Sequence, residues 1–158
     1  MREIKFRGKD KSTNQWVYGY FVGVSGDDVV IIPTGQVNYD LGCIGASNSC
    51  DCHKRSFGQF TGQYDCKGNE IYTCDVIQSY DSEGKPILHY IVWNDAEACF
   101  GAVDIKYHTL SCLNSYWIEE FEKEVVGNMY DNHEYLKMLN KEWYERLELE
   151  QANNNTKI

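Results

Sequence analysis

Residues 16–24 constrain the fold of this chain more than any other part of its sequence. Large side chains stand at every second position, with Gly19 and Gly23 among the residues between them. Successive side chains of an extended strand point to opposite faces, so a period of two predicts a strand rather than a helix. We expect the large residues to share one face of this strand and to lie in the core: Trp16, Tyr18, Tyr20, Val22 and Val24.

Short strand-like segments continue through most of the chain, separated by polar turns. The clearest turn is 65–69, which lies between Tyr64 and the strand-like residues 70–72 and has the composition of a hairpin turn. Residues 42–58 combine three cysteines with glycine, serine and asparagine and show no period, so we predict a long loop there. The sequence therefore predicts a mainly β fold of short antiparallel strands, and two barrel-like halves on either side of the loop are one arrangement that fits.

The period changes to that of a helix near the C-terminus. Asp131 and Asn132 can cap a helix, and Glu134 stands three residues after Asp131, as in a capping box. Apolar residues then recur at spacings of three and four, which predicts an amphipathic helix over 132–151 and a flexible tail over 152–158. This apolar seam either covers the β domain or pairs with another subunit, and we expect a homo-oligomer. The seam consists of Leu136, Leu139, Trp143 and Leu147.

The chain carries 15 Lys and Arg against 24 Asp and Glu, a net charge of −9. This acidic balance opposes broad binding to nucleic acid or to an anionic membrane, since both need a cationic surface. The sequence has no apolar run of about 18 residues and begins with a charged segment, so we expect neither a membrane span nor a secretory signal. Seven cysteines, an odd number, then indicate free thiols and a cytoplasmic protein.

Three blocks of sequence resemble one known family when they are taken in order. They are REIKFRGKDK at 2–11 with Trp16 and Gly19 after it, GQFTGQYDCKGNEIYTCDVI at 58–77, and EVVGNMYDNHEYL at 124–136. Together they resemble the YopX-like family of bacteriophage and prophage proteins. The resemblance implies a β-rich fold with a small SH3-like or roll-type barrel, and it brings no established enzymatic activity with it.

On this basis we place one β domain over 1–131, with sub-lobes 1–41 and 59–131 joined by the predicted loop. The chain departs from the family at Cys74, where the family usually has glycine, and at His133, where proline is common. The residues that match the family's motif are Gly62, Asp65, Gly68, Ile71, Tyr72, Asp75, Gly127 and Asn128.

Asp75 is one of two carboxylates among these motif residues. We interpret it as structural, because an aspartate beside a turn is well suited to accept backbone N–H groups. A role in metal binding or acid–base chemistry would need a second group close by, and the sequence shows none.

Cysteine and histidine gather once in the chain, in the stretch 43–53. Zinc prefers four thiolate or imidazole ligands in a tetrahedron. The spacing opposes a shared ion, because Cys52 and His53 are adjacent and no C-x-x-C pair occurs. We therefore expect free thiols and no cofactor. The alternative is a zinc site formed by Cys43, Cys50, Cys52 and His53, with Cys66 as a substitute ligand.

No phosphate-binding loop, dinucleotide fingerprint or H-E-x-x-H motif occurs, and Cys99 and Cys112 have the surroundings of inert apolar positions, so we expect no enzyme. Residues 1–11 have a net charge of +3 and could join the aromatic strand in binding nucleic acid. Residues 119–158 hold ten acidic and five basic side chains, which could instead mimic DNA.

These observations favour a phage- or prophage-type accessory protein of open biochemical role. We expect it to act without catalysis through protein contacts, as a homo-oligomer and with an unknown host or phage protein. The alternatives are a zinc-binding protein and a protein that binds nucleic acid or mimics DNA, although the net charge makes nucleic acid the weaker option.

Overall fold

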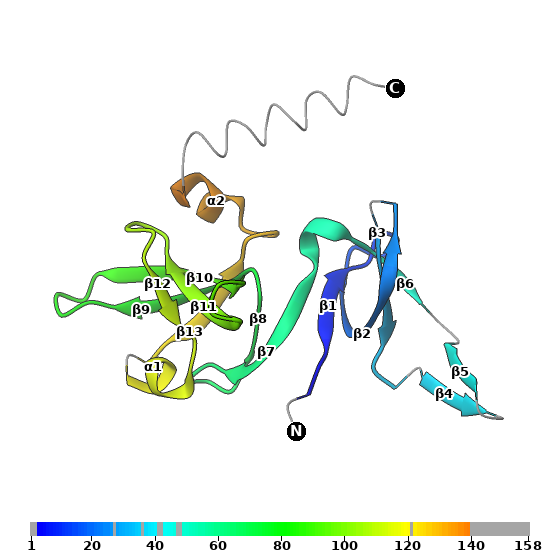
Figure 1. The fold of residues 1–158 in the computed structure, drawn as a ribbon. Coiled ribbons are helices and arrows are strands. Elements are labelled where there is room, and N and C mark those ends of the chain that lie inside the picture. Colours follow the sequence, from blue (N-terminus) through cyan, green and yellow to red (C-terminus); the bar gives the residue numbers. More distant parts are fainter. Residues whose placement is uncertain are drawn as a thin grey trace, which may run out of the picture. The chain divides into compact units, whose positions relative to one another are not determined.

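The computed structural model of this protein describes residues 3–26, 28–35, 37–40, 43–46, 49–120 and 122–139. The chain divides into two compact units, Met1–Cys74 (unit 1) and Asp75–Ile158 (unit 2). Both units consist mainly of antiparallel strands, with few and short helices (Figure 1). The prediction of a mainly β fold is confirmed.

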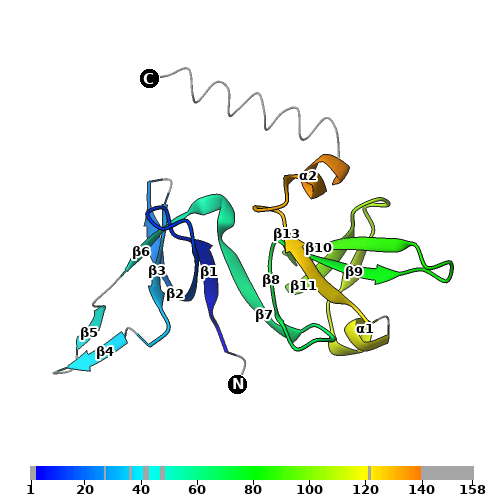
Figure 2. The same ribbon diagram turned by 180° about the vertical axis from the view of Figure 1, so that it is seen from behind.

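Unit 1 contains a six-stranded antiparallel sheet in the order β6-β3-β2-β1-β7-β8. A separate two-stranded hairpin lies between β3 and β6 in the sequence and apart from the larger sheet (Figure 2). The large sheet is formed by β1 (Phe6–Lys9), β2 (Trp16–Ser25), β3 (Asp28–Pro33), β6 (Cys50–His53), β7 (Gly58–Tyr64) and β8 (Glu70–Tyr72), and the hairpin by β4 (Val37–Asp40) and β5 (Cys43–Ala46).

The prediction of a long loop over 42–58 was wrong. This stretch contains β5, β6 and the short helix η1 (Lys54–Ser56). Strand β6 pairs with β3, and its Cys52 is fully buried in a cluster with Val29 and Ile31. Pairing with a distant strand stabilises β6, and a four-residue strand has too few positions to show a period of its own. The two units meet in the sequence at Cys74–Asp75, not at this stretch.

The core of unit 1 lies on the face of β2 opposite to the predicted one. Val17 packs against the cluster of Val29, Ile31 and Cys52, whereas Tyr18 and Tyr20 are 42% and 43% exposed. The prediction that the large residues of β2 form the core was therefore wrong. They also do not share one face, because a bulge between Phe21 and Gly23 shifts the alternation. Four of the predicted core residues are exposed: Tyr18, Tyr20, Val22 and Val24.

Close contacts at two glycines explain why the face of β2 that carries Gly19 is the buried one. A Cβ atom added to Gly19 would overlap the carbonyl oxygen of Ile32, and one added to Gly8 would lie 2.7 Å from Cβ of Cys52. The sheet therefore curls tightly around these positions. Past the end of β1, Asp10 forms an isolated bridge with Cys52 on β6. The strand ladders of the described residues nevertheless form open sheets and no closed barrel.

Unit 2 contains a five-stranded antiparallel sheet in the order β12-β11-β10-β9-β13. Its core includes Val76 and Ile105, with Leu88, Tyr90 and Val126 packed against them. The strands are β9 (Asp75–Tyr80), β10 (Pro86–Asn94), β11 (Cys99–Asp104), β12 (Leu110–Cys112) and β13 (Glu124–Asn128).

Two short helices belong to unit 2. Helix α1 (Ser115–Glu120) connects β12 to β13 and was not predicted, because six residues are too few to show helical periodicity. Helix α2 (His133–Leu139) begins where the capping residues predict it. Of the predicted seam, Leu136 and Leu139 lie in α2, whereas Trp143, Leu147, the remainder of 132–151 and the tail 152–158 lie outside the described residues. Neither described helix could cross a membrane.

Candidate functional site

The family-like block 58–77 forms the β7–β8 hairpin and its tight turn. Oδ1 of Asp65 accepts hydrogen bonds from the backbone N–H groups of Lys67 (2.9 Å) and Asn69 (2.7 Å). Gly68 has a φ of 84°, which glycine adopts without a Cβ clash. The hairpin prediction is confirmed by the pairing of Tyr64 with Glu70. Asp65 and Gly68 therefore shape the turn.

The other motif residues of this block are buried or conformationally special. Ile71 and Tyr72 lie in the core of unit 1. Gly62 has a φ of 82° within β7, at the irregular part of its pairing with β8. The Tyr72 hydroxyl donates to Oε2 of Glu70 over 2.7 Å, and Lys5 forms an ion pair with the same carboxylate. This block thus forms a packed structural element.

Asp75 and the third family-like block meet in unit 2. Asp75 is buried at the start of β9, and its backbone pairs with Asn128 of β13. Oδ1 of Asn128 accepts the N–H groups of Tyr130 (3.0 Å) and Asp131 (2.8 Å), which forms the turn before α2. A Cβ added to Gly127 would overlap the side chain of Asn132. The block therefore positions α2 against the end of β13.

Of the predicted zinc ligands, the structure places Cys50 and Cys52 at the same buried cluster and His53 on the other face of β6. Cys52 points into the core of unit 1, so its neighbour His53 points to the other face of β6. Burial raises the pKa of the Cys52 thiol to about 12, which opposes the thiolate form that zinc binds. Cys43 lies in β5, and Cys66 is exposed in the 65–69 turn. Within the described residues, no three His, Cys, Asp or Glu side chains are arranged to hold a metal ion.

The face of unit 1 that carries Tyr18 combines aromatic rings with cations, and Arg7 and Tyr72 are buried within it. The guanidinium carbon of Arg7 lies 4.7 Å from the ring centroids of both Trp16 and Tyr72. Lys9 places its ammonium group 5.8 Å from the Trp16 ring, and the rings of Tyr18 and Tyr72 are 5.7 Å apart. We call Trp16, Tyr18 and Tyr20 with Arg7 and Lys9 the aromatic face. Strand register explains it, because Arg7 pairs with Tyr18 and Lys9 with Trp16.

Beyond its bulge, β2 exposes a second group of apolar side chains. Phe21, Val22 and Val24 are 41%, 57% and 55% exposed. The Phe21 ring also contacts those of Phe6 and Phe57, with centroids 5.7 and 5.3 Å apart. We call Phe21, Val22 and Val24 the apolar patch. Sequence reasoning missed it because it assigned Val22 and Val24 to the core and placed Phe21 on the opposite face of the strand.

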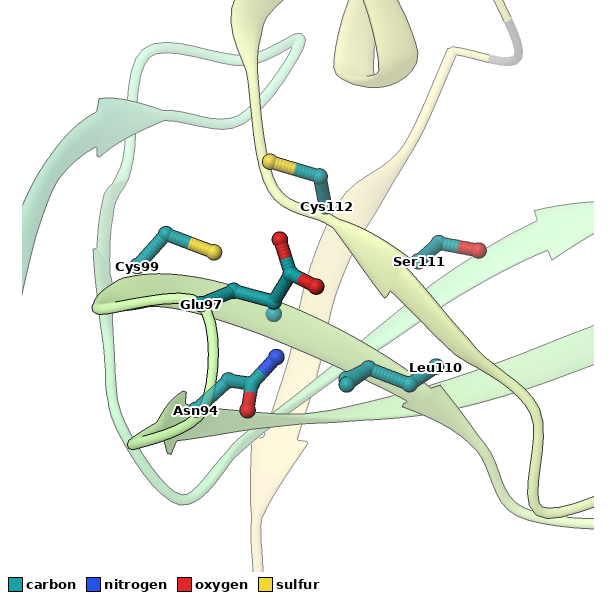
Figure 3. Close-up of a pocket in the computed structure, with 7 residues that line it drawn as sticks. Asn94, Glu97, Cys99, Leu110, Ser111 and Cys112 are labelled. Atoms are coloured by element: carbon teal, nitrogen blue, oxygen red, sulfur yellow. The ribbon is translucent and has the colours of Figure 1, made fainter.

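Unit 2 has a cavity of about 200 Å³ along the β11–β12 edge of its sheet. In Figure 3, the side chains of Cys99, Cys112 and Glu97 extend toward one another above the strands. Burial, and after it the influence of the neighbouring Cys112 thiol, raise the pKa of the Cys99 thiol. Sequence reasoning treated both cysteines as inert fillers. The lining residues are Asn94, Glu97, Cys99, Gly101, Leu110, Ser111 and Cys112.

A buried polar group lies on unit 2 around α1. The Lys123 ammonium donates to the carbonyl oxygen of Trp117 over 2.9 Å and lies 3.9 Å from the Trp117 ring centroid. His89 packs edge-on against the same ring, and its Nε2 is 3.9 Å from Oδ2 of Asp104. Burial lowers the pKa of His89 and lowers that of Lys123 to about 8. Lys123 is 2% exposed, so this group holds the end of α1 rather than offering a binding surface.

Comparisons with known proteins agree with the sequence blocks and with the fold. The family model described as YopX protein matches residues 5–137. No curated protein matches the chain. The crystal structure of protein EF1440 from Enterococcus faecalis is similar, with a TM-score of 0.59 and 18% sequence identity, over 89% of this chain and 100% of that chain. At this identity the likeness concerns the fold alone.

Proposed function

This chain belongs to the YopX protein family, and from that premise we propose that it is a non-enzymatic accessory protein, of the kind carried by phages and prophages, that acts through protein contacts as a homo-oligomer. The observation that carries the proposal is the apolar patch on β2. Its three side chains are each more than two-fifths exposed on a strand in the interior of the sheet. Contiguous exposed apolar side chains are typical of protein interfaces.

The distribution of charge favours a second copy of this chain as the partner. Unit 1 holds eight Lys and Arg and eight Asp and Glu, which gives a net charge of zero. Unit 2 holds seven Lys and Arg and sixteen Asp and Glu, and it therefore carries the entire net charge of −9. Two copies that meet through unit 1 bring together surfaces without net charge. Contact through unit 2 would instead oppose two strongly acidic surfaces, which costs free energy at moderate salt.

A two-fold axis would allow the same three side chains from each copy to meet. At the patch β2 pairs with β3, whereas its pairing with β1 is confined to residues 16–19. We expect the contact between copies to be made by the three side chains. Phe21 is already held by the rings of Phe6 and Phe57, which limits the side-chain entropy lost on association. Association through the patch therefore costs less side-chain entropy than association through a fully mobile side chain would.

Light scattering of the full chain over a concentration series tests this proposal. We expect the mass to rise above that of one chain, and we expect the double variant Val22→Lys with Val24→Lys to stay monomeric, because it places like charges at the contact. Both positions are more than half exposed, so the variant should keep its fold, which circular dichroism checks.

Tyr116→Lys is the matched control, because Tyr116 is an exposed aromatic residue of unit 2, and this variant should assemble like the wild type. A wild-type chain that stays monomeric throughout would contradict the homo-oligomer. Assembly that survives in the double variant and is lost in Trp143→Lys with Leu147→Lys would assign the contact to the predicted helix seam instead.

A second candidate function is the binding of single-stranded nucleic acid, and the aromatic face is the observation that favours it. Tyr18 and Tyr20 are exposed, and Lys9 supplies a cation on the same face, whereas Arg7 is buried against the rings of Trp16 and Tyr72. Bases stack on exposed aromatic rings while cations attract the phosphates. The charge argument against nucleic acid is weaker for unit 1, whose net charge is zero.

Fluorescence titration with a single-stranded oligonucleotide at low and at physiological salt distinguishes the two candidates. Binding to the aromatic face should fall in Tyr18→Ala with Tyr20→Ala and should persist in the Val22 and Val24 double variant. Absence of binding at low salt would remove this candidate, because the phosphate contribution is largest there.

A further inference from the structure

Cys99 and Cys112 lie on adjacent strands and on the same face of the unit 2 sheet. Gly101 of β11 pairs with Cys112 of β12, and Cys99 stands two residues before Gly101. Residues two apart on a strand point to the same side, so the two thiols are diagonal neighbours. Their side chains extend toward one another at the cavity (Figure 3), and neither is in a disulfide.

Gly101 stands opposite Cys112 and has no side chain of its own. The space above it is occupied by Leu110, whose Cδ1 would lie 2.5 Å from a Cβ at this position. Both cysteines line the cavity of about 200 Å³, and Cys112 is exposed while Cys99 is half-buried (Figure 3). A small thiol reagent can therefore reach the pair from solvent.

We propose that Cys99 and Cys112 form a dithiol site that low-molecular-weight disulfides, such as glutathione disulfide, convert into an intramolecular Cys99–Cys112 disulfide. The more exposed Cys112, as the thiolate, attacks one sulfur of glutathione disulfide, forms a mixed disulfide and releases one glutathione. The Cys99 thiolate then attacks the Cys112 sulfur and releases the second glutathione. The two cysteines lose two electrons and two protons, and glutathione disulfide gains both.

Local structure determines how readily the second step occurs. Diagonal neighbours on paired strands are about 7–8 Å apart, beyond the Cα separation that a disulfide usually spans, so the backbone of β12 must move toward β11 for the bridge to form. β12 has three residues and pairs only with β11, and such a short edge strand can adjust. Burial and the Cys112 contact raise the pKa of Cys99, so bridging should accelerate as the pH rises toward that pKa.

The bridge would tie the edge strand β12 covalently to β11 and remove both thiols from the cavity wall. The α1 helix follows β12 directly, so the bridge would also limit motion at the start of that helix. The site lies in unit 2 and is independent of the apolar patch and the aromatic face of unit 1.

The test uses the reduced full chain incubated with glutathione disulfide, followed by alkylation of the remaining thiols, intact-mass measurement and peptide mapping. With the alkylation carried out in denaturant, so that the buried Cys52 also reacts, we expect five of the seven thiols to be alkylated. We expect a mass two hydrogens below that of the reduced chain carrying five alkyl groups, and a crosslinked peptide pair containing Cys99 and Cys112. Cys99→Ser should stop at a glutathione adduct on Cys112. Cys66→Ser, which removes an exposed cysteine of unit 1, should bridge like the wild type.

A stable glutathione adduct on the wild-type chain, a crosslink between any other two cysteines, or seven alkylated thiols after incubation would each overturn the proposal. Faster closure of the Cys99–Cys112 bridge at pH 9 than at pH 7 would support attack by the Cys99 thiolate, since the raised pKa of Cys99 keeps this thiol protonated at neutral pH. A rate that does not change with pH would contradict it.

Discussion

Asp10 shows how one side chain organises the turn after β1. Its Oδ1 accepts hydrogen bonds from the backbone N–H groups of Ser12 (2.8 Å) and Thr13 (2.7 Å) and from both of their hydroxyl groups. The hydroxyl of Ser12 and the N–H of Thr13 are the largest contributions that lower the pKa of the Asp10 carboxyl to about 2. The charged form is therefore favoured in the folded state.

Asp10→Asn should lower the free energy of unfolding at pH 7 by about 2 kcal/mol, because the amide replaces a carboxylate that accepts four hydrogen bonds. The contribution of Asp10 is present above the usual carboxyl pKa of 3.8 and is lost as the pH falls toward 2, since the unfolded chain binds the proton first. Urea unfolding between pH 2 and pH 7 measures both effects.

The variant should accordingly lose less stability than the wild type between pH 4 and pH 2. Asp51→Asn serves as the control, because Asp51 is exposed on β6 and should change stability little. Equal acid sensitivity of Asp10→Asn and the wild type would contradict the assignment of the pKa shift to this turn.

At Cys74 the chain departs from the family pattern, and the backbone conformation at this residue shows the cost of the departure. Its φ is 68°, in the left-handed region that a side chain with a Cβ adopts at a cost of about 1 kcal/mol. The family-like pattern usually has glycine here, and glycine adopts this conformation freely. The departure therefore leaves the backbone conformation unchanged and places strain on it.

Cys74→Gly should raise the free energy of unfolding by about 1 kcal/mol through relief of this strain, less the entropy that glycine adds to the unfolded chain. Cys74→Ala is the control, because it removes the thiol and retains the Cβ. Thermal unfolding of both variants measures the difference, and a Cys74→Ala variant as stable as Cys74→Gly would show that the thiol rather than the φ angle is responsible.

At the scale of an element, β2 shows how two similar glycines can have different roles. Gly19 faces the curled interior of unit 1, where a Cβ would overlap the backbone of Ile32. Gly23 follows the bulge and has no heavy atom within 4 Å of an added Cβ. One glycine is needed for close approach of β3, and the other is not.

Gly19→Ala should therefore cost about 3 kcal/mol or more, because a backbone clash cannot be relieved by moving a side chain. Gly23→Ala in the same strand should change the free energy of unfolding by less than about 1 kcal/mol. Denaturant unfolding of unit 1 compares them, and equal losses for the two variants would contradict the described packing of β2 on β3.

At the scale of the whole molecule, the described residues form the six-stranded sheet and the β4–β5 hairpin of unit 1 and the five-stranded sheet of unit 2, and these share no ladder. The boundary at Cys74–Asp75 lies between β8 and β9, and the net charge of −9 belongs entirely to unit 2. Each unit has its own buried cluster, around Val29 and Ile31 in one and around Val76 and Ile105 in the other. Each unit therefore meets the requirement for folding alone.

We expect a fragment of residues 1–74 to fold as an independent unit with the circular dichroism of a β protein and a cooperative thermal transition. The fragment should have a pI near neutrality, in contrast to the acidic full chain. A fragment that remains unfolded while the full chain folds would show that unit 1 depends on unit 2 for its stability.

The sequence alone determined those features that depend on neighbours along the chain. The extended backbone of β2, the Asp65 turn, the capped start of α2 and the family all follow from local spacing, since alternation, turn chemistry and capping act over a few residues. The family motif also marked Cys74 as unusual, and the structure supplies the reason in its φ angle.

Only the tertiary structure decided which face of β2 is buried and which cysteines are neighbours. Both faces of β2 carry large apolar residues, and the contacts of Gly19 with β3 select the inner one. Cys99 and Cys112 are thirteen residues apart, and the β11–β12 register brings their thiols together. Spacing along one strand predicts which residues share a face. The pairing of strands distant in sequence determines whether that face is buried or exposed.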